Sequence, residues 1–222
     1  MYSFDITENI IQQAPDYVGL MLVFELINTP SDATLWQEID AFIASYEADH
    51  VVADINKEPA ILATRQVYKR LGKDPNRYRP SAEALRRRVL KEKSLYRIDT
   101  LVDLINLVSL KTGYSIGGFD ADQVVGTQLE LGVGQAGESF CGIGRGPLNI
   151  EGLPVYRDAQ GGIGTPTSDE ERTKISLATR RALIIVNGYD GGAGLEDVRK
   201  WFVELLTRYV RATSIETMYY RA

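Results

Sequence analysis

Residues 17–27 read YVGLMLVFELI, a stretch rich in β-branched and aromatic side chains. Pro15 precedes this stretch and the sequence NTPS at residues 28–31 follows it, so turn-forming residues bound it on both sides. A short apolar run between turn signals predicts a buried strand. We expect the fold to be built around this strand.

A series of helices is predicted after the strand. Ser31 or Asp32 can cap the first, in which apolar residues recur at helical spacing through about residue 48. Three more helices are predicted, at residues 61–71, 82–93 and 100–112. Gly72 and Gly113 follow the first and last of these, where a left-handed residue typically ends a helix. The helix at 100–112 is apolar on nearly every side, which predicts that it is buried.

The second half of the chain has a different composition, because it is rich in glycine. Eighteen of the 20 glycines lie between residues 113 and 194, which is typical of short strands joined by tight turns. We expect short strands at residues 127–131, 139–143 and 154–157, one or two strands within 175–187, and a helix at 195–209. Helices, then strands, then a helix favour an α+β fold over regular βαβ alternation. No repeat or linker interrupts the chain, which predicts one domain over residues 1–222.

Composition excludes several classes of protein. The chain has 25 basic and 30 acidic residues, so it is not cationic as a whole. Cys141 and His50 are its only cysteine and histidine, which leaves no His/Cys cluster for zinc or iron–sulfur and fits a reducing cytoplasm. No apolar segment of membrane length and no phosphate-binding loop motif is present, so we expect no membrane span, no metal and no cofactor.

The charges are strongly polarised along the sequence. Residues 65–97 contain 12 Lys/Arg and 3 Asp/Glu, whereas the rest of the chain contains 13 and 27. The cations expected to bind RNA are Arg86, Arg87, Arg88, Lys91 and Lys93, all on the helix predicted at 82–93. Tyr68, Tyr78 and Tyr96 supply aromatic rings in the same segment. The alternative is that the arginines form the solvated side of the helix and pair with acidic residues.

Glycines cluster with carboxylates and hydroxyls in three further segments. They read GGFD at 117–120, GE at 137–138 and GGIGTPTSD at 161–169. Glycine lets a ligand approach the backbone, and Thr, Ser and Asp supply directional hydrogen bonds, so these segments predict a pocket for a small polar molecule. The same residue types are also those that turns require, and this second interpretation stays open.

The sequence from Ser94 onward resembles the B3/B4 domain of the phenylalanyl-tRNA synthetase beta subunit, in its free-standing form. Five segments match the family's motifs in order: IDTLVDLIN at 98–106, GYSIGGFD at 113–120, GE at 137–138, VYRD at 155–158 and residues 161–173. The resemblance covers residues 80–190, and residues 1–79 then form the first half or an N-terminal extension. It implies an α+β fold in which N-terminal helices and one strand pack against a C-terminal mixed or antiparallel β region.

The resemblance also implies a function. In the synthetase this domain hydrolyses tyrosine wrongly esterified to the phenylalanine tRNA, by attack of water on an aminoacyl ester. The family's motif histidine falls on Gly117 here, and its glutamate is replaced near Thr165. Two functions are therefore open: an aminoacyl-tRNA or amino-acid binding domain that hydrolyses mischarged tRNA in trans, and a non-catalytic amino-acid sensor or protein/RNA interaction module. A complete tRNA ligase is not expected.

The resemblance and the residue types together give one predicted site. The predicted catalytic residues are Asp169, Thr165 and Thr167. The predicted ligand-binding residues are Asn106, Gly117, Gly118, Asp120, Glu138, Gly164 and Ser168. The expected partners are tRNA or aminoacyl-tRNA and a free aromatic amino acid, in the cytoplasm, and no oligomeric state is predicted.

Overall fold

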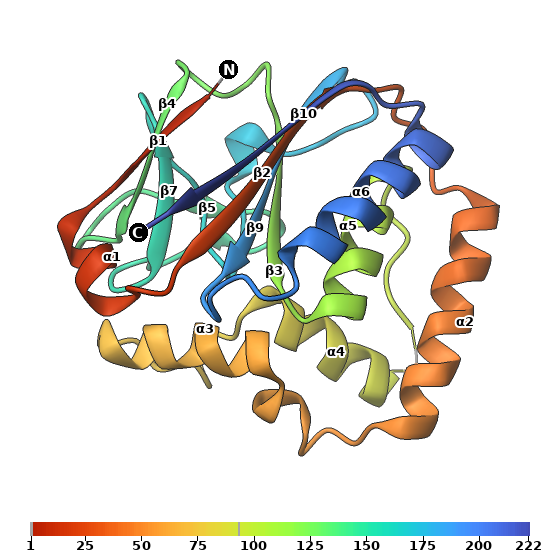
Figure 1. Ribbon diagram of the computed structural model, residues 1–222, viewed down its shortest axis with the longest axis horizontal. Helices are drawn as coiled ribbons and strands as arrows, with labels where there is room; N and C mark the ends of the chain where they lie inside the picture. Colours follow the sequence, from red (N-terminus) through yellow and green to blue (C-terminus); the bar gives the residue numbers. More distant parts are fainter. Residues whose placement is uncertain (1, 93) are drawn as a thin grey trace.

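The computed structural model describes residues 2–92 and 94–222, and its centre is a four-stranded antiparallel sheet (Figure 1). The strand order is β10 (Thr213–Arg221), β2 (Val18–Glu25), β9 (Arg181–Gly188) and β3 (Ser115–Asp120). The predicted strand at 17–27 is β2, which is confirmed as a buried strand because only Glu25 of its eight residues is exposed.

A second four-stranded sheet packs against one face of the central sheet. Its order is β1 (Ser3–Ile6), β4 (Gln128–Val133), β7 (Pro154–Asp158) and β8 (Gly161–Gly164). The β1–β4 pair is parallel and the other two pairs are antiparallel. Two short strands, β5 (Cys141–Gly142) and β6 (Gly146–Pro147), form a separate small hairpin. The mixed and antiparallel β region predicted for the C-terminal half is therefore confirmed, with β1 added to it from the N-terminus.

Helices cover the opposite face of the central sheet. The longer helices are α2 (Ala33–Asp49), α3 (Pro59–Arg70), α4 (Ser81–Glu92), α5 (Thr100–Thr112) and α6 (Leu195–Val210). The shorter ones are α1 (Glu8–Gln13) and the 3-10 turns η1 (Ile55–Lys57) and η2 (Glu171–Thr173). In Figure 1 the second sheet, the central sheet and the layer of α2, α5 and α6 follow one another from left to right, with α3 and α4 below.

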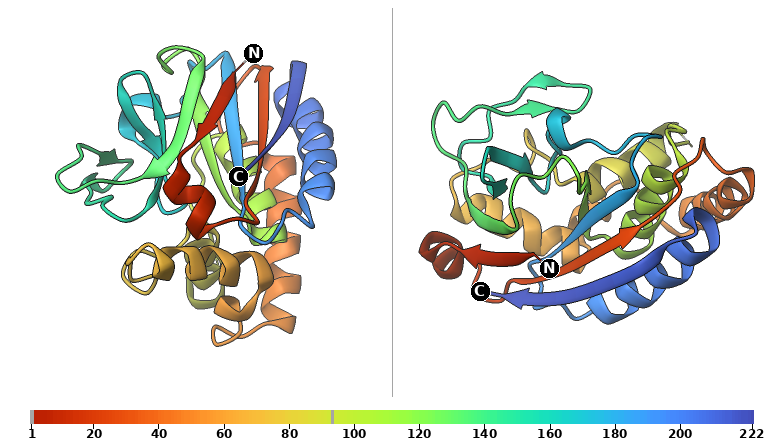
Figure 2. Two further views of the ribbon diagram at one scale, coloured as in Figure 1. Left: turned by 60° about the vertical axis from the view of Figure 1, so that its left-hand side comes forward. Right: turned by 90° about the horizontal axis from the view of Figure 1, so that it is seen from above.

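Side chains of β2 divide between two cores, one on each face. Leu20, Leu22 and Phe24 pack with α2, α5 and α6, whereas Met21 and Val23 pack with the second sheet. Successive strand residues point to opposite faces, so both faces of a strand buried in this way must be apolar. The α+β fold class is confirmed, and Figure 2 shows the helical layer and the two sheets from two further directions. No helix within the described residues is long and apolar enough to cross a membrane.

The predicted helix ends are confirmed by their caps. Asp32 Oδ1 accepts hydrogen bonds from the backbone of Thr34 and Leu35 at 2.8 and 2.9 Å at the start of α2. At α5, Asp99 accepts one from Val102 at 2.9 Å, and Gly113 ends the helix with a φ of 79°. Side-chain acceptors satisfy backbone N–H groups that a helix start leaves unpaired.

Some stretches of the structure differ from the sequence expectation. The strand expected at 139–143 is reduced to the two residues of β5. Of the one or two strands expected within 175–187, one is present as β9, and residues 175–180 contain no strand. Residues 175–180 form a loop, which Asn28 holds in place because its Nδ2 donates to the Ser176 carbonyl at 3.0 Å. Strands β1 and β10 were not predicted, because both depend on pairing with distant partners rather than on a local pattern.

Candidate functional site

A cavity of about 420 Å³ opens between α4, α5 and the start of β3. We call it the α4–α5 cavity. Its lining includes five cations, namely Arg79, Arg87, Arg88, Lys91 and Arg145. The lining also includes Ser81, Glu92, Tyr96, Ile105, Asn106, Ser109, Ile116 and Thr167. The basic helix predicted from the sequence therefore forms one wall of a concave site.

The cations of the cavity are only partly neutralised. Arg87 Nε pairs with Glu83 Oε1 at 2.8 Å, and Arg88 pairs with Glu92 one turn later. Within the described residues, Arg79, Lys91 and Arg145 have no carboxylate oxygen within 4 Å. Glu92 is the one acidic residue of the lining, so the cavity carries excess positive charge. A concave surface with one sign of charge attracts ligands of the opposite sign.

Arg86 is a correction to the predicted RNA-binding set. Its side chain is buried, as are those of Val89 and Ala82 on the same side of α4. Its Nε and Nη2 donate to the Leu110 carbonyl at 3.0 and 2.7 Å, and it pairs with Glu58. Burial lowers the pKa of Arg86. Arg86 ties α4 to α5 and is not available to RNA. Lys93, the last member of the set, lies outside the described residues.

An exposed aromatic ring stands at the rim of the cavity. Tyr96 is 66% exposed, and the Arg88 guanidinium lies 4.2 Å from the centre of its ring. A ring held beside a cation offers a flat face on which a nucleobase or an aromatic side chain can stack. The sequence pattern alone does not distinguish Tyr96 from Tyr68 and Tyr78, the other two tyrosines of the basic segment.

Asn106 and Ser109 bring polar groups from α5 to the cavity wall. Ser109 Oγ donates to the Tyr114 carbonyl at 2.8 Å, so its hydrogen is already used. Asn106, predicted as a ligand-binding residue, lines the cavity, and its side chain makes no hydrogen bond to any described residue. Its amide therefore keeps two donors and one acceptor for a ligand.

The predicted catalytic threonines are bound to protein groups. Thr165 Oγ1 accepts from the backbone of Thr167 and Ser168 at 3.1 and 3.0 Å and donates to the Ser168 carbonyl at 3.0 Å, which closes a turn. Thr167 lines the cavity, and its Oγ1 lies 2.8 Å from Tyr68 Oη and 3.4 Å from the Tyr78 carbonyl. These bonds give both hydroxyls a structural role. Ser168 Oγ likewise donates to the Asp169 carbonyl at 3.4 Å.

Asp169 is the predicted residue with unusual electrostatics. Its Oδ2 accepts from the Gly118 N–H at 3.1 Å, and the carboxylate lies against Gly117 and Gly164, where an added Cβ would be 3.1 and 2.9 Å from Oδ1. Burial raises the pKa of Asp169 to about 7. The carboxyl therefore sits between β3 of the central sheet and β8 of the second sheet. It is not among the residues that line the α4–α5 cavity.

Three glycines of the predicted site serve packing. A Cβ on Gly117 or Gly164 would lie 2.7 or 2.6 Å from Phe119 Cζ, and one on Gly118 would lie 2.7 Å from Ile105 Cδ1. Real Cβ atoms do not approach other atoms so closely, so each glycine is required by a neighbouring side chain. The space beside Gly117 is filled by Phe119.

The last two predicted carboxylates lie elsewhere. Asp120 Oδ2 accepts from Thr179 Oγ1 at 2.7 Å, and Glu138 forms two 2.7 Å bonds with Arg157. Burial raises the pKa of Glu138, but the Arg157 pair and the hydrogen bond from the Gln135 N–H together lower it more, and the net shift is downward. Neither residue lines the cavity. The single predicted site thus separates into a cavity with Asn106 and Thr167, a buried carboxyl at Asp169, and structural pairs.

Sequence reasoning did not select Arg79 and Arg145 for the site. Arg79 belongs to the basic segment 65–97, so that segment's charge was the available signal. Arg145 lies in the β5–β6 hairpin, which the Ile143 N–H joins to the Asp169 carbonyl at 3.0 Å. This and other long-range contacts of the hairpin, such as the bridge between Gly142 and Glu170, place Arg145 in the cavity lining. Within the described residues, no group of His, Cys, Asp or Glu side chains could hold a metal ion.

Comparisons with known proteins place the chain in a family. No curated protein matches it. Among solved structures, an N-terminal fragment of the phenylalanyl-tRNA synthetase beta-subunit from Pyrococcus horikoshii is similar with a TM-score of 0.48 and 13% identity. The match covers 99% of this chain and 54% of that one, so the chain spans about half the length of the fragment. The model of the B3/4 domain matches residues 63–212, which is more than half of the chain. The chain therefore belongs to the B3/4 domain family.

Proposed function

We propose that this B3/4 domain binds tRNA and holds the single-stranded, aminoacylated 3′ end in the α4–α5 cavity. The observation that carries the proposal is the combination of unneutralised cations with an exposed aromatic ring and a free amide in one concave site. The matched family and the resemblance of residues 98–120 to the synthetase motifs support tRNA as the class of RNA.

The cations would contact phosphates and the ring would contact a base. Lys91, Arg79 and Arg145 are the side chains of the lining without a carboxylate partner among the described residues, so phosphate contact costs them no existing ion pair. Each phosphate contact releases counterions, so affinity should fall steeply as salt rises. Stacking on Tyr96 and hydrogen bonds from Asn106 would position the terminal nucleoside or its amino acid.

Binding without catalysis is better supported than ester hydrolysis. Thr165 and Thr167 already hydrogen-bond to protein groups, and Glu138 is held by Arg157. One observation favours hydrolysis as a second candidate function. Burial raises the pKa of Asp169 to about 7, close to the value that suits a general base at neutral pH. We propose the non-catalytic module as the main function and Asp169 as the residue on which any hydrolysis would depend.

A tRNA binding assay with matched charge variants tests the main proposal. We expect Arg79→Gln with Arg145→Gln to weaken binding of aminoacylated phenylalanine tRNA about tenfold and to reduce its salt dependence. Lys69→Gln is the control, because Lys69 lies in the same basic segment on α3 but does not line the cavity. Equal losses in both variants, or no tRNA binding by the wild-type protein, would contradict the proposal.

Hydrolysis is tested separately by following ester loss. The protein is incubated with phenylalanine tRNA that carries tyrosine or phenylalanine, and ester loss is compared with a sample without protein. We expect tRNA to bind without accelerated ester loss. Selective loss of the tyrosyl ester that disappears in Asp169→Asn would instead establish editing in trans.

The cavity could also take a smaller ligand, a free aromatic amino acid. A free aromatic amino acid in the cavity would stabilise the protein, by about 2.7 kcal/mol at 100 times its dissociation constant, and thermal melts with tyrosine or phenylalanine measure this.

We further propose that residues 1–222 form one domain. Strand β2 lies between β10 and β9, and β1 pairs with β4, so the segment 1–79 supplies strands to both sheets.

A further inference from the structure

A second concave surface lies at the far end of the central sheet. It is a groove of about 510 Å³ lined by Arg180, Arg181 and Arg211 together with Glu25, Asp122 and Thr213. Strand β2 ends here, β9 and β10 begin here, and α6 ends here. We call it the arginine groove. None of its residues belongs to the α4–α5 cavity.

The charges of the arginine groove are unevenly balanced. Glu25 is the register partner of Arg181 across β2 and β9, and Asp122 and Arg181 both act on the pKa of Tyr2. The groove therefore contains three guanidinium groups and two carboxylates, and Glu25 is the carboxylate opposite Arg181 in the sheet. No carboxylate oxygen of a described residue lies within 4 Å of Arg180 or Arg211.

Arg180 is also held in place. Its Nη1 donates to the carbonyls of Leu177 and Thr179 at 2.9 and 3.0 Å, which orients the guanidinium and leaves its other N–H groups available. A guanidinium oriented in this way is prepared for a bidentate contact with a phosphate or carboxylate.

The backbone at the arginine groove is unusual as well. Arg211 and Ser214, with φ of 51° and 53°, are the two non-glycine residues of positive φ within the described part of the chain. They flank Thr213, which lines the groove. Arg211 ends α6 in the left-handed conformation that glycine adopts at least cost, and another residue pays about 1 kcal/mol there. Strained residues of this kind cluster at binding sites.

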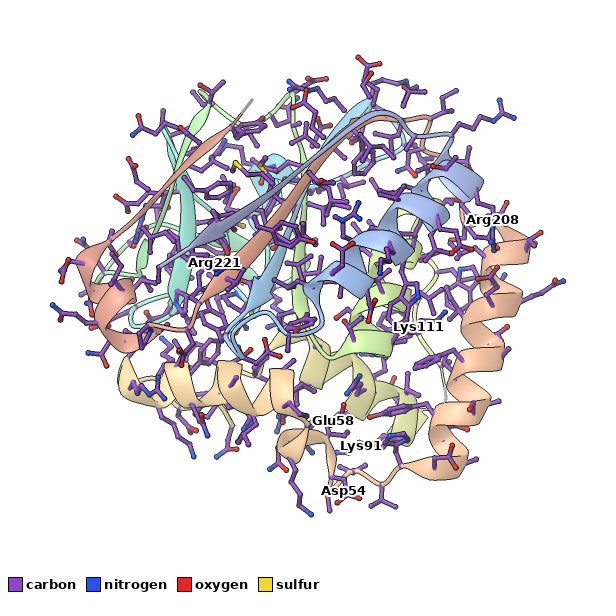
Figure 3. The ribbon with its side chains drawn as sticks, in the orientation of Figure 1. Asp54, Glu58, Lys91, Lys111, Arg208 and Arg221 are labelled. Carbon is purple, nitrogen blue, oxygen red and sulfur yellow. The ribbon has the colours of Figure 1, made fainter. Side chains whose placement is uncertain are left out.

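We propose that Arg180 and Arg211 bind a phosphate group in the arginine groove, and that with RNA bound this phosphate belongs to the RNA backbone. The source of the phosphate rests on the proposed function, whereas the site itself does not. Ile116, which lines the cavity, is the register partner of Val186 on β9. The groove begins at Arg181, also on β9, so the two sites are roughly 17 Å apart along this strand. In Figure 3, Lys91 of the cavity is far from Arg208, which lies on the last turn of α6 before Arg211.

The salt dependence of tRNA binding tests the inference. In Arg180→Gln with Arg211→Gln, we expect the slope of log affinity against log salt to become shallower by about 0.7, because loss of one phosphate contact with a single strand removes about 0.7. Arg221→Gln is the control, because Arg221 lies at the other end of β10, near the C-terminus (Figure 3). A slope unchanged by the double variant overturns the RNA contact.

Arg211→Gly separates binding from a structural role. Glycine relieves the positive φ, so we expect the melting temperature to stay equal or rise while affinity for RNA falls severalfold. If Arg211 instead served the fold, Arg211→Gly would melt earlier. Lower stability with unchanged RNA affinity overturns the inference.

Inorganic phosphate distinguishes failure of the site from failure of the proposed function. We expect phosphate to raise the melting temperature of the wild-type protein, relative to chloride at equal ionic strength, and not that of the double variant. If the wild-type protein binds no tRNA but shows this shift, the proposed function fails and the phosphate site stands. If phosphate gives no shift and the double variant keeps the wild-type salt slope, the site is rejected.

Discussion

The α4–α5 cavity and the surroundings of Asp169 both contain polar side chains, but some of those in the cavity are free to bind a ligand and that of Asp169 is enclosed. Asn106 and Lys91 line the cavity without a bond to another described side chain, whereas Asp169 lies between two strands and accepts from Gly118. Arg86 and Arg88 show the same contrast two residues apart on α4, because one is buried against Leu110 and the other stacks on the exposed Tyr96. Residue type therefore does not separate binding groups from structural ones; packing and hydrogen-bond saturation do.

The largest expected effect is loss of a buried charge. Glu83 is fully buried between Arg65, at 2.7 Å, and Arg87, at 2.8 Å. We expect Glu83→Ala to lower the free energy of unfolding by about 3–5 kcal/mol, because it leaves the buried Arg65 unpaired. Chemical denaturation measures this. A loss below about 1 kcal/mol would show that the ion pairs of Glu83 do not stabilise the fold.

Filling the space beside Phe119 should have the next largest effect. We expect Gly117→Ala to destabilise the protein by about 1–3 kcal/mol, because the new Cβ would lie 2.7 Å from Phe119 Cζ. Adding Phe119→Leu should recover part of this loss by removing the ring atoms that clash. If the double variant loses more stability than the sum of the losses in the two single variants, contact with the Phe119 ring is not the cause of the destabilisation.

Asp169 should make stability depend on pH. Because burial raises its pKa from 3.8 to about 7, the folded protein keeps a proton that the unfolded chain releases between these values. The contribution of Asp169 to stability is therefore present at low pH and is lost as pH rises toward 7. We expect Asp169→Asn to gain about 1–3 kcal/mol relative to wild type between pH 5 and pH 8. Parallel pH profiles for the two proteins would mean that this carboxyl titrates normally.

The smallest effect concerns the acid that lines the cavity. Glu92 is exposed and pairs with Arg88, so Glu92→Gln should change the free energy of unfolding by less than about 1 kcal/mol. The same change removes the one negative charge of the lining, and we expect RNA affinity to rise about twofold to fivefold at low salt. A fall in affinity would mean that Glu92 orients Arg88 for binding.

Local patterns were sufficient for the elements that carry their own signals. The strand at 17–27 was recognisable because both of its faces are apolar. Helices α2 and α5 were recognisable because Asp32 marks the start of the first and Gly113 the end of the second. The strands β1 and β10 carry no such signal. Their pairing with β4 and β2 joins residues more than a hundred positions apart, and side-chain pattern alone does not reveal such partners.

The sequence alone determined the α+β class, the resemblance to the B3/4 domain and the basic segment that forms a wall of the cavity. Only the tertiary structure decided which of the marked residues can meet a ligand. It turned Arg86 inward, closed Thr165 into a turn, and placed Arg145, from a distant hairpin, in the lining of the cavity that Asn106 also lines. The physical reason is that a polar side chain is available to a ligand only if folding leaves it exposed and without a partner, and this depends on contacts between remote segments.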